Sequence, residues 1–187
     1  MKFPKIPLNY GTIAGMVYFL LFVLLYYAGL NPLGKWSYLG VWIPFVVIFL
    51  GIKHLRDREL GGNISFGKAV GSGMLISFVF ASLFGILSYS FGSFIATDVV
   101  ELEMTELMQQ MDEMQIQIDE MKAMGNSSFA ESLQVYYNKA AEGLEKNPEN
   151  FTLSAFLWGD FTGKLYGGFF VSLIIGLILK KKEALIQ

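Results

Sequence analysis

The chain has 187 residues and a mass of 20.9 kDa, so it allows one ordinary domain or one small bundle of membrane helices. Apolar residues make up 53% of the chain and charged residues only 16%, whereas soluble domains carry about 25% charged residues. Cysteine is absent and histidine occurs once, which excludes disulfide frameworks, thiol chemistry, iron–sulfur clusters and nearly every zinc site. We therefore expect an all-α integral membrane protein that holds no cofactor and binds no nucleic acid.

Four apolar stretches are long enough to cross a bilayer, which takes about 20 residues of helix. They run from about 8–30, 36–52, 69–94 and 153–179. The first has no cleavage site after its apolar run, so we expect a retained anchor rather than a signal peptide. Pro44 predicts a kink in the short second span. A polar link over 53–65 joins the second and third spans.

Residues 97–150 differ from the rest of the chain in charge. They hold twelve of the sixteen acidic residues and three lysines, a balance of −9, while all other residues sum to +7. Basic residues of a membrane protein concentrate on the cytoplasmic side. The sequence thus predicts three regions, 1–96 with three spans, an extracytoplasmic acidic insertion over 97–150, and 151–187 with the fourth span and a basic cytoplasmic tail. Both termini are expected in the cytoplasm.

The acidic insertion has the apolar periodicity of a helix. A stripe at heptad a and d positions is flanked by Glu, Asp and Gln, and its members are Val100, Met104, Leu107, Met111, Met114, Ile118 and Met121. Gly125-Asn126 predicts the end of this helix, and a second helix follows from Ser127 or Ser128. We expect a helical hairpin whose first helix continues directly from the third span. The stripe then packs on its own hairpin, on a second copy or on a partner.

Methionine is concentrated in the same helix. Met108, Met111 and Met114 have a spacing that suits a Cu(I) site, because thioethers are soft ligands. Methionine is also an adaptable filler of helix interfaces, and no Cys or His stands nearby. A metal site is therefore the weaker interpretation of this cluster.

Small residues recur every three or four positions within the spans. Since lipid gives helices no hydrophobic drive to associate, close backbone contact over small side chains replaces it. The predicted helix-packing positions are Gly11, Gly15, Gly73, Ser77, Ala81, Gly85, Ser88, Gly92, Gly168, Ser172 and Gly176. The fourth span carries a further row, Gly159, Gly163 and Gly167. A substrate path lined by the serines is the alternative.

Asp160 and Lys164 are ionisable residues within the fourth span, where charge is costly and marks a functional hypothesis. Their i,i+4 spacing places them on one helix face, so they can neutralise each other. Lys164 can also extend towards the headgroups. We expect a structural charge pair near the membrane interface, with a ligand or proton role as the alternative.

The chain resembles the domain-of-unknown-function family 4199, small four-pass membrane proteins found mostly in Bacteroidota. The resemblance rests on Gly11 to Gly15, on the stretch 52–69, on the helical insertion and on the glycine-rich last span that ends in lysines. It implies a multi-pass topology and a bacterial inner-membrane location, and it supplies no catalytic residues.

No phosphate loop, nucleophile–base pair or metal motif is present in the sequence. The expected function is that of a non-enzymatic accessory subunit of the bacterial inner membrane. Its hairpin would serve oligomerisation or docking to an envelope partner. The alternative is a subunit of an oligomeric transporter or channel, in which Ser77, Ser88, Asp160 and Lys164 would face a cavity.

Overall fold

A computed structural model of the chain describes residues 5–146 and 151–180. Within these residues the fold is helical and has no strand. In chain order the elements are α1 (Lys5–Tyr27), the 3-10 segment η1 (Lys35–Gly40), α2 (Trp42–His54), the π-helical segment η2 (Leu55–Glu59), α3 (Phe66–Phe94), α4 (Val99–Ala123), α5 (Ser127–Lys146) and α6 (Leu153–Leu179).

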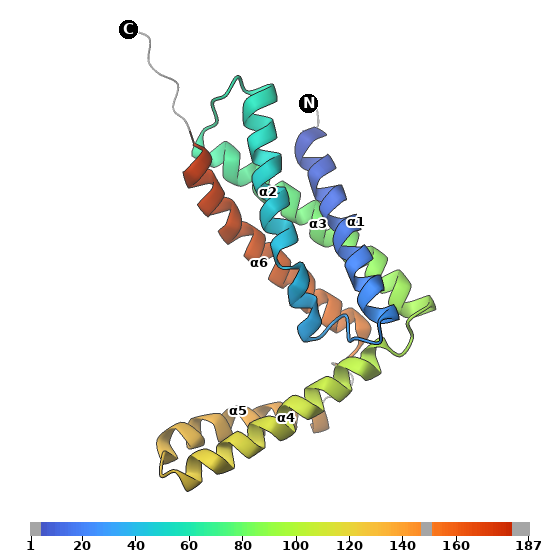
Figure 1. Cartoon of the computed structure of the whole chain (residues 1–187), viewed down its shortest axis with the longest axis vertical. Coiled ribbons are helices and arrows are strands. Elements are labelled where there is room, and N and C mark those ends of the chain that lie inside the picture. Colours follow the sequence, from blue (N-terminus) through green and yellow to red (C-terminus); the bar gives the residue numbers. More distant parts are fainter. Residues whose placement is uncertain (1–4, 147–150, 181–187) are drawn as a thin grey trace.

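The four predicted spans are confirmed as four helical segments long and apolar enough to cross a membrane. The shortest, α1, has 23 residues, and at about 1.5 Å per residue it covers the roughly 30 Å of a bilayer's hydrocarbon core. The four segments form an elongated bundle in which α1 begins and α6 ends at the same end (Figure 1). This architecture indicates a multi-pass membrane protein.

The second span is longer than expected. With η1 and η2 it runs from Lys35 to Glu59, so most of the predicted polar link over 53–65 is helical. The irregularity lies ahead of Pro44, at the junction of η1 and α2. Pro44 itself falls in the first turn of α2, where a missing backbone N–H breaks no helical hydrogen bond.

The expectation that the insertion continues the third span was wrong. α3 ends at Phe94 and α4 begins at Val99, and the two helices meet at a sharp angle (Figure 1). The backbone N–H groups of Ile95 and Ala96 both bond the carbonyl of Phe91, which closes the last turn of α3. Ala96 and Val99 are fully buried in the apolar cluster around Phe91. Burying these two side chains turns the chain, although no Gly or Pro interrupts it.

The core of the bundle consists of two apolar clusters. The cluster at the α4 end is largely aromatic, with rings of α1 meeting rings of α3 edge to face, and its buried members are Ala14, Tyr18, Phe22, Phe80, Phe84, Phe91, Ala96 and Val99. The cluster at the other end is aliphatic, and its buried members are Ile48, Ile52, Leu55, Ile64, Ala69, Ile76, Ile175 and Leu179. The most extensive contact between helices joins α3 to α6.

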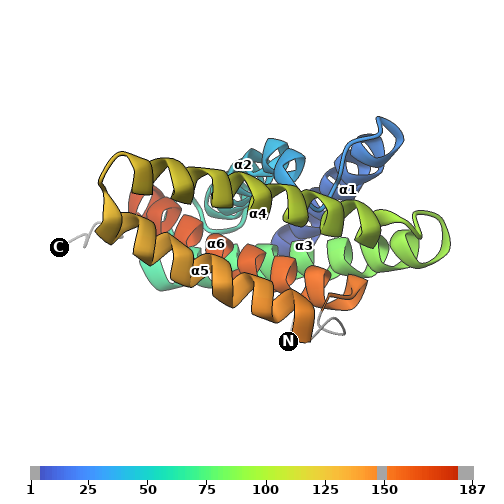
Figure 2. The ribbon, with the colours of Figure 1, turned by 90° about the horizontal axis from the view of Figure 1, so that it is seen from below.

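Helices α4 and α5 lie outside the bundle and pack along each other (Figures 1 and 2). They cross the end of the bundle rather than extending its axis. Gly125 joins them with a φ of 78°, a left-handed conformation that glycine adopts without a steric penalty. The predicted break at Gly125-Asn126 therefore coincides with the turn.

Candidate functional site

The contact between α3 and α6 is built from two reciprocal Gly–Ser pairs. Gly73 of α3 faces the Ser172 side chain of α6, and Gly168 of α6 faces the Ser77 side chain of α3, both without room for another carbon atom. The two serine hydroxyls donate to carbonyls of their own helices, Ser77 to Gly73 and Ser172 to Gly168. Their polar groups are thus satisfied while the backbones approach closely.

Other predicted small residues lie at further helix contacts. A Cβ on Gly11 would lie 2.8 Å from the Ile76 carbonyl oxygen, and one on Gly15 would lie 3.1 Å from Leu83, so α1 approaches α3 there. Gly92 faces Leu153 at 2.7 Å, and Gly176 faces Val70 at 3.1 Å. Ala81 and Ser88 are also buried on α3, and the Ser88 hydroxyl has no hydrogen-bond partner among the described residues.

The prediction that Gly85 packs against another helix was wrong. No atom of the described residues lies within 4 Å of a Cβ placed there, and Gly85 lines an open hollow with Tyr89, Trp158 and others. The neighbouring Phe84 points into the aromatic core and is 2% exposed. A spacing of three or four residues fits either position, and contacts of the Phe84 ring with Tyr18 and Phe22 of α1 bury Phe84 in place of Gly85.

The glycine row of α6 does not contact another helix. Cβ atoms built on Gly159, Gly163 and Gly167 would meet nothing within 4 Å in the described part of the chain. These glycines instead line two hollows between α6 and the second span. The mouth hollow, about 580 Å³, lies next to α4 and includes Gly159, and the inner hollow, about 300 Å³, includes Gly163 and Gly167.

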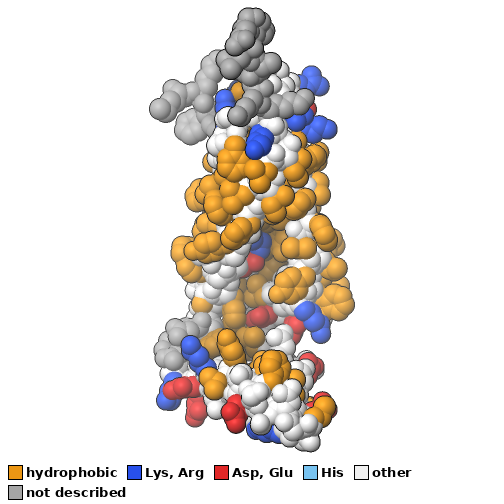
Figure 3. Space-filling view, turned by 90° about the vertical axis from the view of Figure 1, so that its left-hand side faces the viewer, with side chains coloured by type: hydrophobic (Ala, Val, Ile, Leu, Met, Phe, Trp, Pro, Cys, Tyr) orange, Lys and Arg blue, Asp and Glu red, His pale blue; other side chains and the backbone are white. Residues whose placement is uncertain are grey.

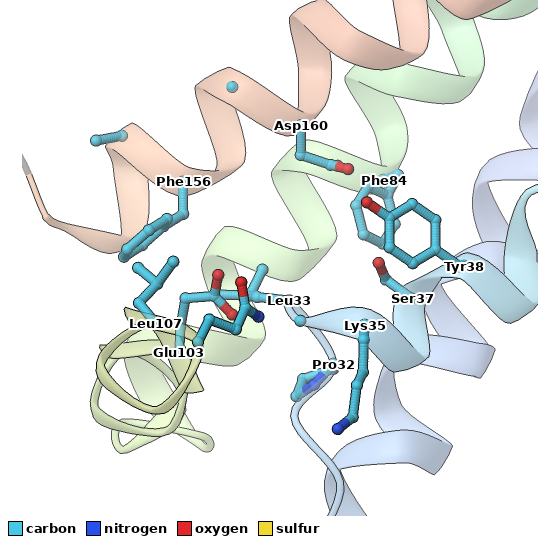
Figure 4. A pocket seen from close by; sticks show the side chains of 14 residues that line it. Pro32, Leu33, Lys35, Ser37, Tyr38, Phe84, Glu103, Leu107, Phe156 and Asp160 are labelled. Atoms are coloured by element: carbon cyan, nitrogen blue, oxygen red, sulfur yellow. The ribbon is translucent and has the colours of Figure 1, made fainter. Parts of the chain in front are cut away.

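The two hollows form one groove, because Ser37, Tyr38 and Asp160 line both. On the face shown in Figure 3 the bundle is hollowed between ridges of apolar side chains, with acidic and basic side chains inside the hollow. In the close view of the mouth hollow, Asp160 of α6 lies across from Tyr38 and Ser37 of η1 (Figure 4). Glu103 and Leu107 of α4 line its outer end.

Asp160 and Lys164 form an ion pair along α6. The Lys164 side chain is 9% exposed and lies inside the bundle, with its Nζ 4.4 Å from the Tyr18 ring centroid and 4.5 Å from that of Phe84. The side chain therefore runs back one turn along α6 towards Asp160 and is enclosed by the bundle. The Asp160 side chain is 33% exposed on the groove, while its buried Oδ2 has no hydrogen-bond donor among the described residues. The buried Lys164 cation is thus stabilised by the Asp160 carboxylate and by the faces of two aromatic rings.

The loop between the first two spans is fastened to α4 by polar contacts. Asn31 Nδ2 donates to Glu103 Oε2 at 2.6 Å and to Glu106 Oε2 at 2.8 Å, and the Lys35 backbone N–H donates to Glu106 Oε1 at 3.2 Å. Gly34 leaves room for the Glu106 carboxylate against the backbone. Burial raises the pKa of Glu103, opposed by the Asn31 hydrogen bond and reinforced by the Glu106 charge.

The heptad stripe occupies the less exposed face of α4. Ile118 is fully buried and the other six members, Val100, Met104, Leu107, Met111, Met114 and Met121, are partly buried. Ala130 is the buried residue of α5. Of the methionine cluster, Met111 and Met114 belong to this face, whereas Met108 is 55% exposed.

Sequence reasoning missed Asn31, Glu103 and the groove they adjoin. Glu103 and Glu106 stand in an acidic helix among many similar residues, so no local pattern distinguishes them. One signal was available, since Gly159, Gly163 and Gly167 are a second small row on a helix that needs only one row to pack.

Comparison with known proteins gives the family. No curated protein and no solved structure matches the chain significantly. Residues 9–181, nearly the whole chain, match the family described as "Protein of unknown function (DUF4199)". The expected resemblance is thus confirmed, and the chain belongs to the DUF4199 family.

Proposed function

We propose that this protein is a non-enzymatic accessory subunit of the bacterial inner membrane, and that α4 and α5 form an extracytoplasmic helical hairpin for oligomerisation or docking to an envelope partner. One observation carries the proposal. The helix pair lies outside the four spans and still exposes large apolar side chains, namely Met108, Ile116, Met124, Phe129, Val135 and Tyr136. Six large apolar side chains exposed on two helices outside the spans are more than such a pair needs for solubility, and exposed apolar surface is typical of interaction sites.

The charge distribution supports the orientation. Within the described residues Lys53, Arg56, Arg58 and Lys68 lie around the end of the bundle opposite α4. The acidic helices occupy the other end, so the positive-inside rule puts the basic end in the cytoplasm. Because the chain has no cysteine, single-cysteine labelling tests this cleanly. A membrane-impermeant thiol reagent added to spheroplasts should label Ser127→Cys and not Arg58→Cys, and the opposite pattern would reverse the orientation.

Photo-cross-linking in native membranes tests the docking role. A photoreactive amino acid at Ile116 or at Tyr136, which are 59% and 72% exposed, should give discrete products of the same mass. The matched probe at Arg58, at the opposite end of the bundle, should not give them. A product of twice the chain mass means a homo-oligomer, and another mass means a partner. Absence of products from both positions would contradict the proposal.

A second function, a subunit of an oligomeric transporter or channel, is favoured by a different observation. Asp160 lines a groove, and the Lys164 side chain is enclosed by the bundle beside the Tyr18 ring. Charge inside a membrane bundle commonly marks a solute path. Ion-flux measurements on proteoliposomes would support this role only if a flux is present and falls in Asp160→Asn.

A further inference from the structure

We propose that the groove between α6 and the second span binds one phospholipid that carries a primary-ammonium headgroup. The ammonium lies in the mouth hollow between the carboxylates of Glu103 and Asp160, and the phosphate lies beside Lys35. An acyl chain follows the inner hollow along the glycine row.

The charged end of the groove lies at the depth of lipid headgroups. α6 has 27 residues, about 40 Å of helix against a hydrocarbon core of about 30 Å. Asp160 is seven residues from the start of α6, about 10 Å along its axis. A hydrocarbon core that ends at Leu179 therefore begins near Asp160. Trp158 and Trp42 are exposed at the same end, 67% and 70%, as is typical of residues at the membrane interface. A lipid in this groove therefore has its headgroup beside Asp160.

The charges of the mouth hollow suit an ammonium next to a phosphate. Glu103 accepts one hydrogen bond, from Asn31, and the Asp160 side chain, which pairs with Lys164 through Oδ1, is 33% exposed on the groove. Glu106 is already engaged by the loop. Lys35 supplies an exposed cation at the rim, for which no carboxylate partner is found in the described part of the chain. A primary ammonium can donate hydrogen bonds to the groove-facing side of both carboxylates, whereas a quaternary ammonium has no N–H to donate.

The inner hollow suits a hydrocarbon chain. Its wall on α6 is backbone at Gly163 and Gly167, and Val41, Pro44 and Val171 make the lining away from the Asp160–Lys164 pair apolar. The open space over these glycines is part of the hollow. A larger side chain at either position would fill the space that the chain occupies.

The shape of the groove favours a lipid over a helix of a second copy. Leu107 and Glu103 of α4 stand across the outer end of the mouth hollow, opposite Phe156 of α6 (Figure 4). A membrane helix that followed the groove would have to continue through α4. A phospholipid ends at this level, so it fits beneath α4.

Lipid binding to the purified full chain tests the proposal. Short-chain phosphatidylethanolamine, phosphatidylcholine and phosphatidylglycerol are added separately to lipid-free protein in detergent, and bound lipid is read by native mass spectrometry and by the midpoint of thermal unfolding. We expect phosphatidylethanolamine to bind about tenfold more tightly or better than the other two, the usual effect of a hydrogen bond to a charged group. One lipid should bind per chain.

Two variants and one control locate the site. Gly163→Leu, which fills the inner hollow, should abolish the preference, and Glu103→Gln should weaken phosphatidylethanolamine binding selectively. Gly85→Leu places the same side chain in a different open hollow and should bind normally. Unfolding midpoints without lipid show whether each variant is folded. If Gly163→Leu does not fold, Glu103→Gln alone still tests the proposal.

Three outcomes would overturn the proposal. Equal binding of the three lipids would remove the role of the ammonium. Binding of free phosphoethanolamine as tight as that of the lipid would mean a solute site. Loss of a dimer in Gly163→Leu, without any change in lipid binding, would mean that a second copy occupies the groove.

Discussion

The most direct test of the contact between α3 and α6 is the substitution Gly168→Ala. A methyl group on Gly168 would overlap the Ser77 hydroxyl and Cβ, both rigidly held on the facing helix. Inserting one carbon into a packed core costs about 1–3 kcal/mol. For a chain of this length that loss lowers the midpoint of thermal unfolding by roughly 2–12 °C.

The neighbouring residue provides the control. Gly167→Ala adds the same methyl group to the same helix, but none of the residues that the structure describes lies within 4 Å of it. It should leave stability unchanged or raise it, because alanine favours helix over glycine by about 1 kcal/mol. Unfolding is followed in detergent by circular dichroism.

A second substitution on the facing helix should rescue the first. Without the Ser77 side chain, the nearest remaining atom to the new methyl group is the Ser77 Cα, at 3.8 Å, an ordinary contact distance. The double variant Gly168→Ala with Ser77→Gly should therefore be more stable than the sum of the two single changes predicts. Additive effects would refute the close approach of α3 and α6 at this point.

Three further predictions concern charge and the helix pair. Asp160→Asn should lower stability by about 3–5 kcal/mol, since it leaves the enclosed Lys164 cation without its carboxylate. Adding Lys164→Met should recover most of that loss in thermal unfolding, and an equal loss in both variants would contradict the pairing. The raised pKa of Glu103 means that the folded protein binds its proton more tightly than the unfolded chain, so this residue costs stability as pH rises above the ordinary glutamate range. Glu103→Gln should thus unfold at a higher temperature than the parent at pH 7 but not at pH 4, and a constant difference would contradict the assignment. Ile118→Asp should separate α4 from α5 and speed tryptic cleavage there, whereas Ile116→Asp, at a 59% exposed position, should not.

The sequence determined what depends on local composition. Hydropathy and length predicted the four spans, and for α6 they predicted both ends, because exclusion from water is summed along a segment and needs no partner. Gly125-Asn126 predicted the turn between α4 and α5, because the left-handed conformation there is a property of the residue itself. The apolar stripe of α4 predicted which face is the less exposed one.

Tertiary structure decided the features that depend on contacts between different helices of the chain. Periodicity gives α3 a small-residue stripe, but only the aromatic rings of α1 place Phe84 inside and Gly85 outside. Two glycine rows on α6 look alike in the sequence, and one meets Ser77 while the other borders an open groove. The turn at 95–98 arises from burial of Ala96 and Val99, a contact between elements that no local pattern records. Lys164 lies against the rings of Tyr18 and Phe84, which belong to other helices, so only the assembled bundle determines its surroundings.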